Sequence, residues 1–296
     1  MAKIKADRTV VRNGAYKKSE FSIRERHNER LNECYYNADI ELDRKNLNVY
    51  FKQSEGSYAE TFEKMLADGT ITVKGLKTDG RAKVFDELVF DVNTDYFERN
   101  GGYEYAKSFF EEAYRLAIKE IGGEQYVLSA VMHADERNKA LSEHYGRDVY
   151  HYHLHVVYIP VVDKDVLWTK RCKDPELVGT VKETIKQVSH SKKWPKLKQY
   201  HENGEVVRNA KGKAELLNSY SLLQDSFAAL IRKYFDVEEL DAPMLNELVS
   251  KIEVHEREIA DGERVQKVDI YYNFVGIINQ ARECRTAAYH WVEKAV

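Results

Sequence analysis

Residues 126–133 (YVLSAVMH) and 152–160 (YHLHVVYIP) are the two segments from which the fold can be read. Both are short and rich in Val, Tyr and Leu, and a polar stretch separates them, so each predicts a β-strand. Alternate side chains of a strand share a face, which places His153 and His155 together. His133 ends the first strand, and antiparallel pairing would bring it opposite His153 or His155. The sequence therefore predicts a hairpin that gathers three histidines.

Three clustered imidazoles are a typical ligand set for a divalent metal, and they leave positions open for water or substrate, as catalytic sites do. Imidazole binds zinc, manganese, iron, nickel and copper, so the histidines alone leave the metal undetermined. Asp135 and Glu136 follow His133 closely. Such a carboxylate can bind the metal, orient a ligand or accept a proton. The alternative is a histidine-rich hairpin that packs and forms hydrogen bonds without a metal.

The rest of the chain predicts an α+β fold. Residues 47–52 and 87–92 are rich in Val, Phe and Leu, as strands are. Residues 103–121 have apolar side chains at helical spacing and end at two glycines. Further helical patterns lie near 175–189 and 216–235. Strands without strict β-α-β alternation predict an antiparallel sheet with helices packed on it.

Composition and length are those of an ordinary globular protein. The chain has 296 residues, of which 43% are hydrophobic and 32% charged. Its cysteines (Cys34, Cys172 and Cys284) form no CxxC pair, which disfavours a disulfide framework or a zinc knuckle. The basic start lacks the apolar segment of a secretory signal, and no apolar run is long enough for a membrane span. We therefore expect a cytoplasmic protein.

The net charge of −3 hides an uneven distribution. Residues 164–213 contain 13 Lys or Arg and 6 Asp or Glu, whereas residues 236–296 contain 7 and 13. Such asymmetry is compatible with a local basic surface for nucleic acid within an acidic total. A solvated basic face is the alternative.

Two basic segments carry candidate DNA contacts. RERHNER (24–30) groups arginines, which bind phosphate in bidentate fashion, around a histidine that can act as nucleophile or base. SHSKKWPKLK (189–198) combines lysines with a tryptophan, the elements of single-strand binding. Taken alone, the first segment is more often a charged helix face. The candidate DNA-binding residues are Arg24, Arg26, Asn28, Lys192, Lys193, Trp194 and Lys196.

The acidic C-terminal part predicts a separate module. KIEVHERE (251–258) and VQKVDIYYNFVGII (265–278) have strand patterns, and Asp261-Gly262 between them is a turn signal. We place a boundary near 236–245, with residues 1–236 as one domain and 237–296 as a tail module.

In this order, the motifs resemble the Mob/Pre relaxases, the MobV family of plasmid mobilisation and recombination proteins. The resemblance covers about the first 235 residues. It is carried by HNER (27–30) with NADI (37–40) and LN (47–48), by AVMHADE (130–136) with HYHLHVVYIP (151–160), and by VSHSKKW (188–194) with SYSLLQDSF (219–227).

The resemblance implies an endonuclease fold of the HUH type, with His153-Leu154-His155 on a central strand. It implies nicking of one DNA strand at an origin of transfer and covalent capture of the 5′ phosphate. His27 would be the nucleophile, with Tyr35 and Tyr36 as rivals. The metal ligands would be His133, His153 and His155, with Glu136 as an auxiliary acid, base or ligand and Arg30 as a phosphate clamp. The metal would be Mn²⁺ or Mg²⁺, with Zn²⁺ or Ni²⁺ as alternatives.

Two features depart from the family. The loop before the HxH strand is longer than usual, and Tyr152 stands where a proline is common. The tail from about 240 resembles the C-terminal segment of large serine recombinases. Expected partners are single-stranded or hairpin origin DNA and either a second copy or accessory mobilisation proteins. The competing functions are a DNA-binding remnant without catalysis and a metal-dependent hydrolase of another substrate, although HExxH is absent.

Overall fold

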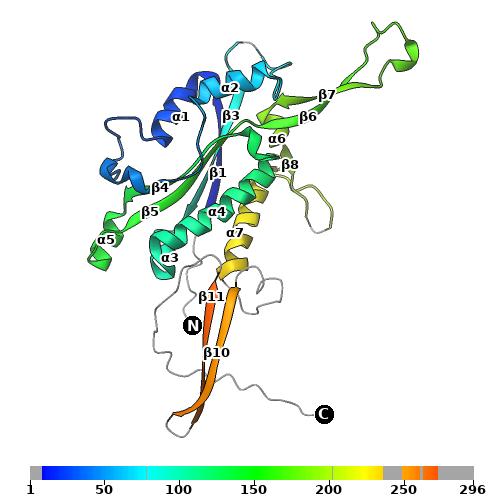
Figure 1. Ribbon diagram of the computed structural model, residues 1–296. Coiled ribbons are helices and arrows are strands. Elements are labelled where there is room, and N and C mark those ends of the chain that lie inside the picture. Colours follow the sequence, from blue (N-terminus) through cyan, green and yellow to red (C-terminus); the bar gives the residue numbers. More distant parts are fainter. Residues whose placement is uncertain (1–8, 78, 202, 236–248, 261–262, 273–296) are drawn as a thin grey trace, which may run out of the picture. The chain divides into compact units, whose positions relative to one another are not determined.

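A five-stranded antiparallel sheet in the order β1-β3-β5-β4-β2 organises the N-terminal part of the chain (Figure 1). The computed structural model describes residues 9–77, 79–201, 203–235, 249–260 and 263–272. Residues Met1–Val237 and Glu238–Val296 form two compact units. The sheet strands are β1 (Thr9–Lys17), β2 (Val49–Lys52), β3 (Lys83–Val92), β4 (Val127–Arg137) and β5 (Tyr150–Tyr158).

The predicted histidine hairpin is confirmed at the centre of this sheet. Strands β4 and β5 pair antiparallel, with His133 opposite His153 and Val131 opposite His155. On its other side β5 pairs with β3, where Val89 is opposite His155. The histidines therefore lie on inner strands, where hydrogen bonds on both sides hold the backbone of His153 and His155 in place.

Helices cover the sheet face opposite the histidines and form the apolar core. Long helix α4 (Gly102–Ile121) packs on β4 and β5 as predicted, beside α3 (Thr94–Asn100) and α7 (Ser221–Phe235) (Figure 1). The Phe227 ring lies 5.0 Å from that of Phe90 and 5.6 Å from that of Phe109, measured between centroids. The buried side chains of this face include Leu88, Phe90, Val92, Met132, Leu154 and Val156. Burial of this surface is the main stabilising contribution to the fold.

Shorter segments stand on the histidine side. They are α1 (Phe21–Asn28), the 3-10 helix η2 (Leu42–Leu47) and α2 (Tyr58–Ala67). The 3-10 turn η1 (Lys18–Glu20) directly precedes α1, and η3 (Glu124–Tyr126) directly precedes β4. Between β4 and β5, where the sequence predicted a polar loop, lies the short helix α5 (Lys139–Tyr145). Its N-cap Asn138 accepts a hydrogen bond from the Leu141 backbone, and Gly146 ends it at φ 64°.

The helix predicted near 175–189 is wrong. Residues Val181–Val188 form strand β7, which pairs antiparallel with β6 (Val161–Leu167). Val181, Ile185 and Val188 recur at helical spacing, which explains the error. The backbone hydrogen bonds of β7 are instead made with β6. The connecting segment contains the 3-10 turn η4 (Pro175–Leu177).

The remaining elements of this unit are α6 (His190–Lys193) and the short pair β8 (Lys196–Lys198) and β9 (Leu216–Asn218). In the second unit, the predicted hairpin is confirmed as β10 (Val249–Ala260) paired antiparallel with β11 (Glu263–Tyr272). The turn signal itself, Asp261-Gly262, lies outside the described residues. In the part of the chain that the structure describes, no helix is both long and apolar enough to cross a membrane.

Candidate metal and nucleophile site

Three buried imidazoles converge on the helix-poor face of the sheet. One ring nitrogen from each of His133, His153 and His155 lies within 4.8 Å of the others. His133 is fully buried, and His153 and His155 are 7% exposed. Their convergence follows from the strand register, because all three side chains point to the same face of adjacent strands.

The hydrogen bonds of these rings identify the nitrogens that are available to a metal. His133 Nε2 donates to the Asn28 carbonyl at 2.8 Å, so its Nδ1 is unprotonated. That Nδ1 lies 3.3 Å from His153 Nε2. His155 Nε2 is buried without a hydrogen-bond partner among the described residues. Burial lowers the pKa of His133 and His153 well below the usual value, so both rings are neutral at neutral pH. This donor set fits a divalent cation, which accepts neutral imidazole nitrogens.

Glu87 on β3 orients one of the three imidazoles, and sequence reasoning missed it. Its Oε1 accepts hydrogen bonds from His155 Nδ1 at 2.8 Å and from Asn28 Nδ2 at 2.7 Å. Burial alone would raise the pKa of Glu87, but the hydrogen bonds from His155 and Asn28 outweigh it and lower the pKa to about 2. A carboxylate that accepts from a ligand histidine fixes its tautomer and leaves Nε2 free for the metal. The signal in the sequence was an acidic residue between the apolar residues of KVFDELVFDV (83–92).

Replacing Glu87 with glutamine is expected to weaken Mn²⁺ binding by about 10–100-fold, the usual effect of losing such a partner. The amide keeps the side-chain shape but removes the negative charge beside His155. Calorimetric Mn²⁺ titration measures the change. The matched control is Asp91→Asn on the same strand and face, because Asp91 contacts His151 and Arg12 rather than a candidate ligand. Equal affinities of the Glu87 variant and the native protein would contradict the orienting role.

His27 lies at the rim of the cluster, on α1. The centroid of its ring is 5.9 Å from that of His155 and 6.2 Å from that of His133. Burial, assisted by the nearby His155 and Arg30, lowers the pKa of His27 to about 4. The imidazole is therefore neutral at neutral pH and has a lone pair available for attack. The structure thus brings His27 to the predicted ligands from about a hundred residues away in the chain.

Arg30 is used within the protein, which corrects its predicted role as a phosphate clamp. Its Nε and Nη2 donate to the two oxygens of buried Asp135, each at 2.8 Å. Nη2 also donates to Glu136 Oε1 at 2.9 Å, and Nη1 to the His27 carbonyl at 3.0 Å. These bonds use four of the five guanidinium donors, and the side chain is 1% exposed. Arg30 therefore fixes the end of α1 to β4, and its backbone has a φ of 52°.

Glu136 occupies the position predicted for an auxiliary residue. Its Oε1 lies 3.6 Å from His153 Nε2. Together with His133 and Asp135 it forms a second group whose candidate ligand atoms lie within 4.8 Å of one another. Asp135 is bound by Arg30 and by Asn48 Nδ2 at 2.9 Å, whereas Glu136 shares one oxygen between Arg30 and the side of His153.

The sequence comparisons place the chain in a family. The Mob_Pre family, described as plasmid recombination enzyme, matches residues 5–220. The chain belongs to this family. The expected resemblance to the Mob/Pre family is thereby confirmed, and with it the prediction of a plasmid recombination enzyme. A second family, a domain of unknown function, matches residues 220–279. The resemblance of this tail to serine recombinases stays a prediction.

Solved structures similar to this Mob_Pre chain are of the MobM relaxase domain. One is Mn-bound at pH 6.8 with plasmid pMV158 oriT DNA; it is 24% identical, with a TM-score of 0.43, and the match covers 57% of this chain and 78% of that one. Another, Mn-bound at pH 5.5, has a TM-score of 0.42 with the same identity and coverage. No curated protein matches the chain.

The Mob_Pre motif HNER also contains a corrected prediction. Asn28, expected to bind DNA, is fully buried and donates to Glu87. Arg26 is exposed, with its Nε bonded to Asn32 Oδ1 at 2.9 Å. Arg24 lies over the Tyr16 ring, 4.0 Å from its centroid. DNA contact by Arg24 and Arg26 stays a prediction.

The segment SHSKKW contributes to packing instead of stacking on a base. Trp194 is buried at 9% exposure, and its Nε1 donates to the Tyr158 hydroxyl at 2.6 Å. Tyr158 lies on β5 an odd number of residues from His153 and His155, so it points to the opposite face of the sheet. The stacking role of Trp194 is therefore wrong. Lys193 Nζ donates to the Ile121 carbonyl at 2.8 Å. DNA binding by the exposed Lys192 and Lys196 stays a prediction.

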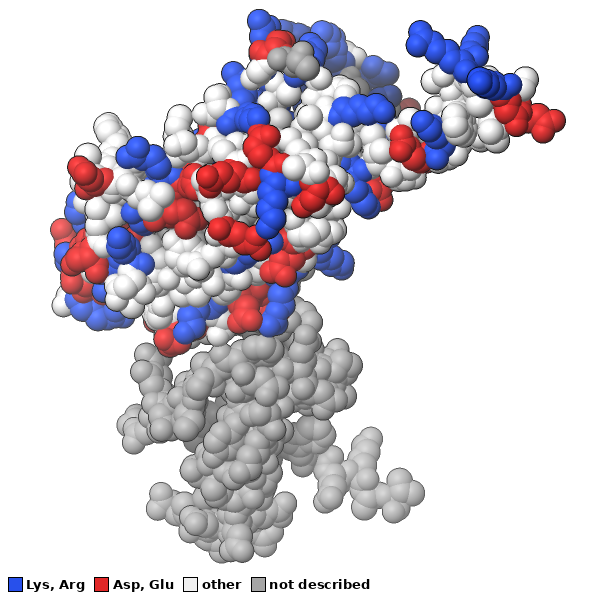
Figure 2. Space-filling view, turned by 45° about the horizontal axis from the view of Figure 1, so that its top comes forward, with Lys and Arg blue, Asp and Glu red and all other residues white. Residues whose placement is uncertain are grey.

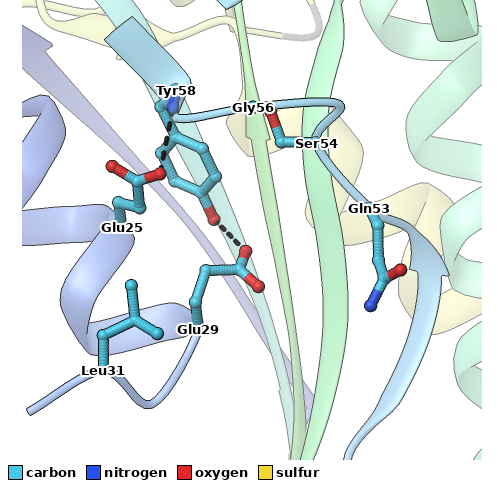
Figure 3. A pocket seen from close by; sticks show the side chains of 7 residues that line it. All are labelled: Glu25, Glu29, Leu31, Gln53, Ser54, Gly56 and Tyr58. Atoms are coloured by element: carbon cyan, nitrogen blue, oxygen red, sulfur yellow. Dashed lines mark hydrogen bonds between the residues drawn. The ribbon is translucent and has the colours of Figure 1, made fainter. Parts of the chain in front are cut away.

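A pocket of about 310 Å³ opens beside α1 (Figure 3). Glu25 and Glu29 line it, and the Tyr58 hydroxyl points to Glu29 Oε1 at 2.6 Å. The Tyr58 backbone N–H donates to Glu25 at 3.2 Å, so these carboxylates join α1 to the start of α2. Ser129 Oγ donates to the same Glu29 oxygen at 2.8 Å. The pocket is therefore an acidic neighbour of the histidine site.

Proposed function

We propose that the chain nicks one DNA strand at an origin of transfer and captures the 5′ phosphate on His27, with one divalent metal bound by His133, His153 and His155. The observation that carries this proposal is the buried cluster of three imidazole nitrogens, within 4.8 Å of one another, beside a neutral His27. In a family of plasmid recombination enzymes, DNA is the substrate that such a site serves.

The donor set favours particular metals. Three imidazoles, with Glu136 as a further ligand, suit Mn²⁺, Zn²⁺ or Ni²⁺ better than Mg²⁺, which prefers oxygen ligands. When bound, a divalent cation neutralises charge on the scissile phosphate and polarises a non-bridging oxygen. Among the metals expected from sequence, the donor set therefore disfavours Mg²⁺ and leaves Mn²⁺, Zn²⁺ and Ni²⁺ as candidates.

The covalent step requires only one attacking atom from the protein. A neutral His27 nitrogen forms a bond to phosphorus, and the bond between phosphorus and the 3′ oxygen breaks. The 3′ oxygen leaves with that electron pair and takes a proton from water, and the other ring nitrogen of His27 releases its proton to the resulting hydroxide. The product is a phosphoramidate on His27 and a free 3′ hydroxyl, which can attack phosphorus in the reverse step and reseal the strand.

Arg30 and Asp135 position the nucleophile. The Arg30 guanidinium donates to the carbonyl of His27 itself and is held by Asp135, which lies two residues after His133. The buried ion pair thus fixes the backbone of the nucleophile relative to a metal ligand. Such positioning lowers the entropic cost of attack. Glu25 and Glu29 repel phosphate from the neighbouring pocket, so the strand is expected to pass His27 on another side.

A single experiment tests the proposed function. Supercoiled plasmid carrying the cognate origin is incubated with the protein and Mn²⁺, and a denaturing gel is run to detect protein-linked DNA. We expect a relaxed plasmid and a DNA-protein adduct, both lost with chelator. Salt-sensitive DNA binding without an adduct would instead indicate a catalytically inactive remnant. Hydrolysis of another substrate without nicking would indicate a different hydrolase.

Deleting residues 240–296 is expected to leave metal affinity and nicking within about twofold of the full chain, since mutations that share no partners with a site couple weakly to it. The proposed nucleophile, metal ligands and auxiliary residues lie between His27 and His155, in the first unit. The isolated hairpin β10–β11 is marginal without a packing partner, so we propose that the tail supports stability, a homodimer or contacts with accessory mobilisation proteins. Gel nicking assays and light scattering measure both effects. Loss of nicking in a folded, metal-bound deletion variant would show that the tail completes the site.

A further inference from the structure

The hairpin of β6 and β7 extends as an arm from the N-terminal unit (Figure 1). At its base, Thr72 bonds through its backbone to Lys186 and Val188, each at 2.8 Å. Beyond the base, β6 and β7 pair only with each other among the described strands. The seven residues of β6 extend over about 23 Å at the usual rise per residue. The arm is therefore long and has two free edges.

The tip of the arm is an ordered loop. Trp168 N–H donates to the Thr180 carbonyl and Gly179 N–H to the Trp168 carbonyl, each at 2.9 Å. Asp174 caps the 3-10 turn that begins at Pro175. Along the arm, exposure rises from 0% at Val188 to 54% at Val181. A free hairpin with exposed apolar residues is marginal in water, which indicates that the outer arm serves a partner.

Unpaired cations gather at this outer end. Figure 2 shows Lys and Arg side chains clustered there, with fewer acidic groups beside them. Lys170, Arg171, Lys173 and Lys182 are exposed, and none enters an ion pair within the described part of the chain. Near the base, by contrast, Lys186 is paired with Asp163 at 2.6 Å. Phosphate groups could therefore contact the tip cations without breaking an existing ion pair.

The shape of the arm selects the form of nucleic acid. The major groove of B-form DNA is about 12 Å wide and admits a two-stranded β-ribbon. A single strand is bound instead by aromatic rings that stack on bases. At the tip, the described aromatic side chain is Trp168, and Lys182 Nζ lies 5.0 Å from its ring centroid, which engages one face of the ring. Ribbon, free edges and unpaired cations fit a duplex better than a single strand.

We propose that the β6–β7 arm binds duplex DNA next to the nicked strand, in the major groove, through Lys170, Arg171 and Lys173. The inference rests on the proposed function for its DNA partner and adds the surface that holds the double-stranded part of the substrate. It adds a basic contact on the hairpin that precedes SHSKKW, the segment whose tryptophan is buried.

The test compares the full chain with a triple variant, Lys170→Ala with Arg171→Ala and Lys173→Ala. The matched control removes three cations from α4, on the face opposite the histidines: Lys107→Ala with Arg115→Ala and Lys119→Ala. The probes are a fluorescent duplex of arbitrary sequence, two helical turns long, and one of its strands alone. Fluorescence anisotropy across a salt series measures affinity for each.

We expect the arm variant to lose at least about tenfold in duplex affinity and to lower the log-log salt slope by about 2–3, because three phosphate contacts disappear. Its affinity for the single strand and the affinities of the control should stay within about twofold of the native protein. An equal loss on single strand and duplex, or an equal loss in the control, would overturn the proposal. The arm variant should still nick a single-stranded origin oligonucleotide, so absence of nicking in the native protein would contradict the proposed function without deciding the role of the arm.

Discussion

The His27→Ala variant is expected to form no covalent DNA adduct and to lose nicking by about 10³-fold or more, because the attacking nitrogen is removed. The three candidate ligands remain in place, since they come from β4 and β5 and not from α1. A labelled origin oligonucleotide and a denaturing gel with Mn²⁺ measure the loss. Mn²⁺ affinity should stay within about tenfold of the native value. About tenfold is the smallest loss expected when a residue that hydrogen-bonds to a metal ligand is removed.

The chemistry of the adduct separates His27 from its rivals. A phosphoramidate on histidine is labile in mild acid, whereas a phosphotyrosine bond survives it. Tyr36 is fully exposed, and the Tyr35 hydroxyl donates to the Arg26 carbonyl at 3.1 Å. The variants Tyr35→Phe and Tyr36→Phe are therefore expected to retain the adduct. Peptide mapping of an acid-stable adduct to either tyrosine would contradict the assignment of His27.

The sequence predicted the centre of the fold because its signals are local. Alternation along a strand is sufficient to place His153 and His155 on the same face. Antiparallel pairing in the hairpin then brings His133 opposite His153. Helix α4 could likewise be predicted from the sequence, since its apolar spacing and terminal glycines lie within one continuous segment. In both cases the residues that decide the structure are close together in the chain.

The parts that sequence could not predict depend on contacts between distant segments. The chain of hydrogen bonds from Asn28 through Glu87 to His155 joins three elements, and none of their local patterns specifies the others. The indole of buried Trp194 likewise donates to the hydroxyl of Tyr158, which lies on β5, far from Trp194 in the sequence. Lysines around an aromatic residue are typical both of a DNA-binding segment and of a packed segment with a charged rim. Only the tertiary structure distinguishes these two cases.

Removing a candidate ligand is expected to have the second large effect. In the His155→Ala variant, Mn²⁺ affinity should fall by more than about 100-fold, and nicking should disappear with it. About 100-fold is the largest usual loss when only a hydrogen-bond partner of a ligand is removed. The reason is that His155 supplies a buried Nε2 with no other hydrogen-bond partner among the described residues, while Glu87 holds its Nδ1. Calorimetric titration measures affinity directly and does not depend on activity.

The matched control for this prediction is His151→Ala. His151 lies on the same strand, and its ring stacks 5.1 Å from that of His153, yet its nitrogens contact Thr94 and Asp91 instead of the other candidate ligands. Its loss should change Mn²⁺ affinity by less than about tenfold. Because alanine at 155 leaves the Glu87 carboxylate without its histidine partner, circular dichroism and thermal unfolding without metal must first show that the variant is folded. The variant His153→Gln provides a second test of a candidate ligand. Native Mn²⁺ affinity in a folded variant at either position would show that the three histidines are not the metal site, and that their facing nitrogens are satisfied in another way.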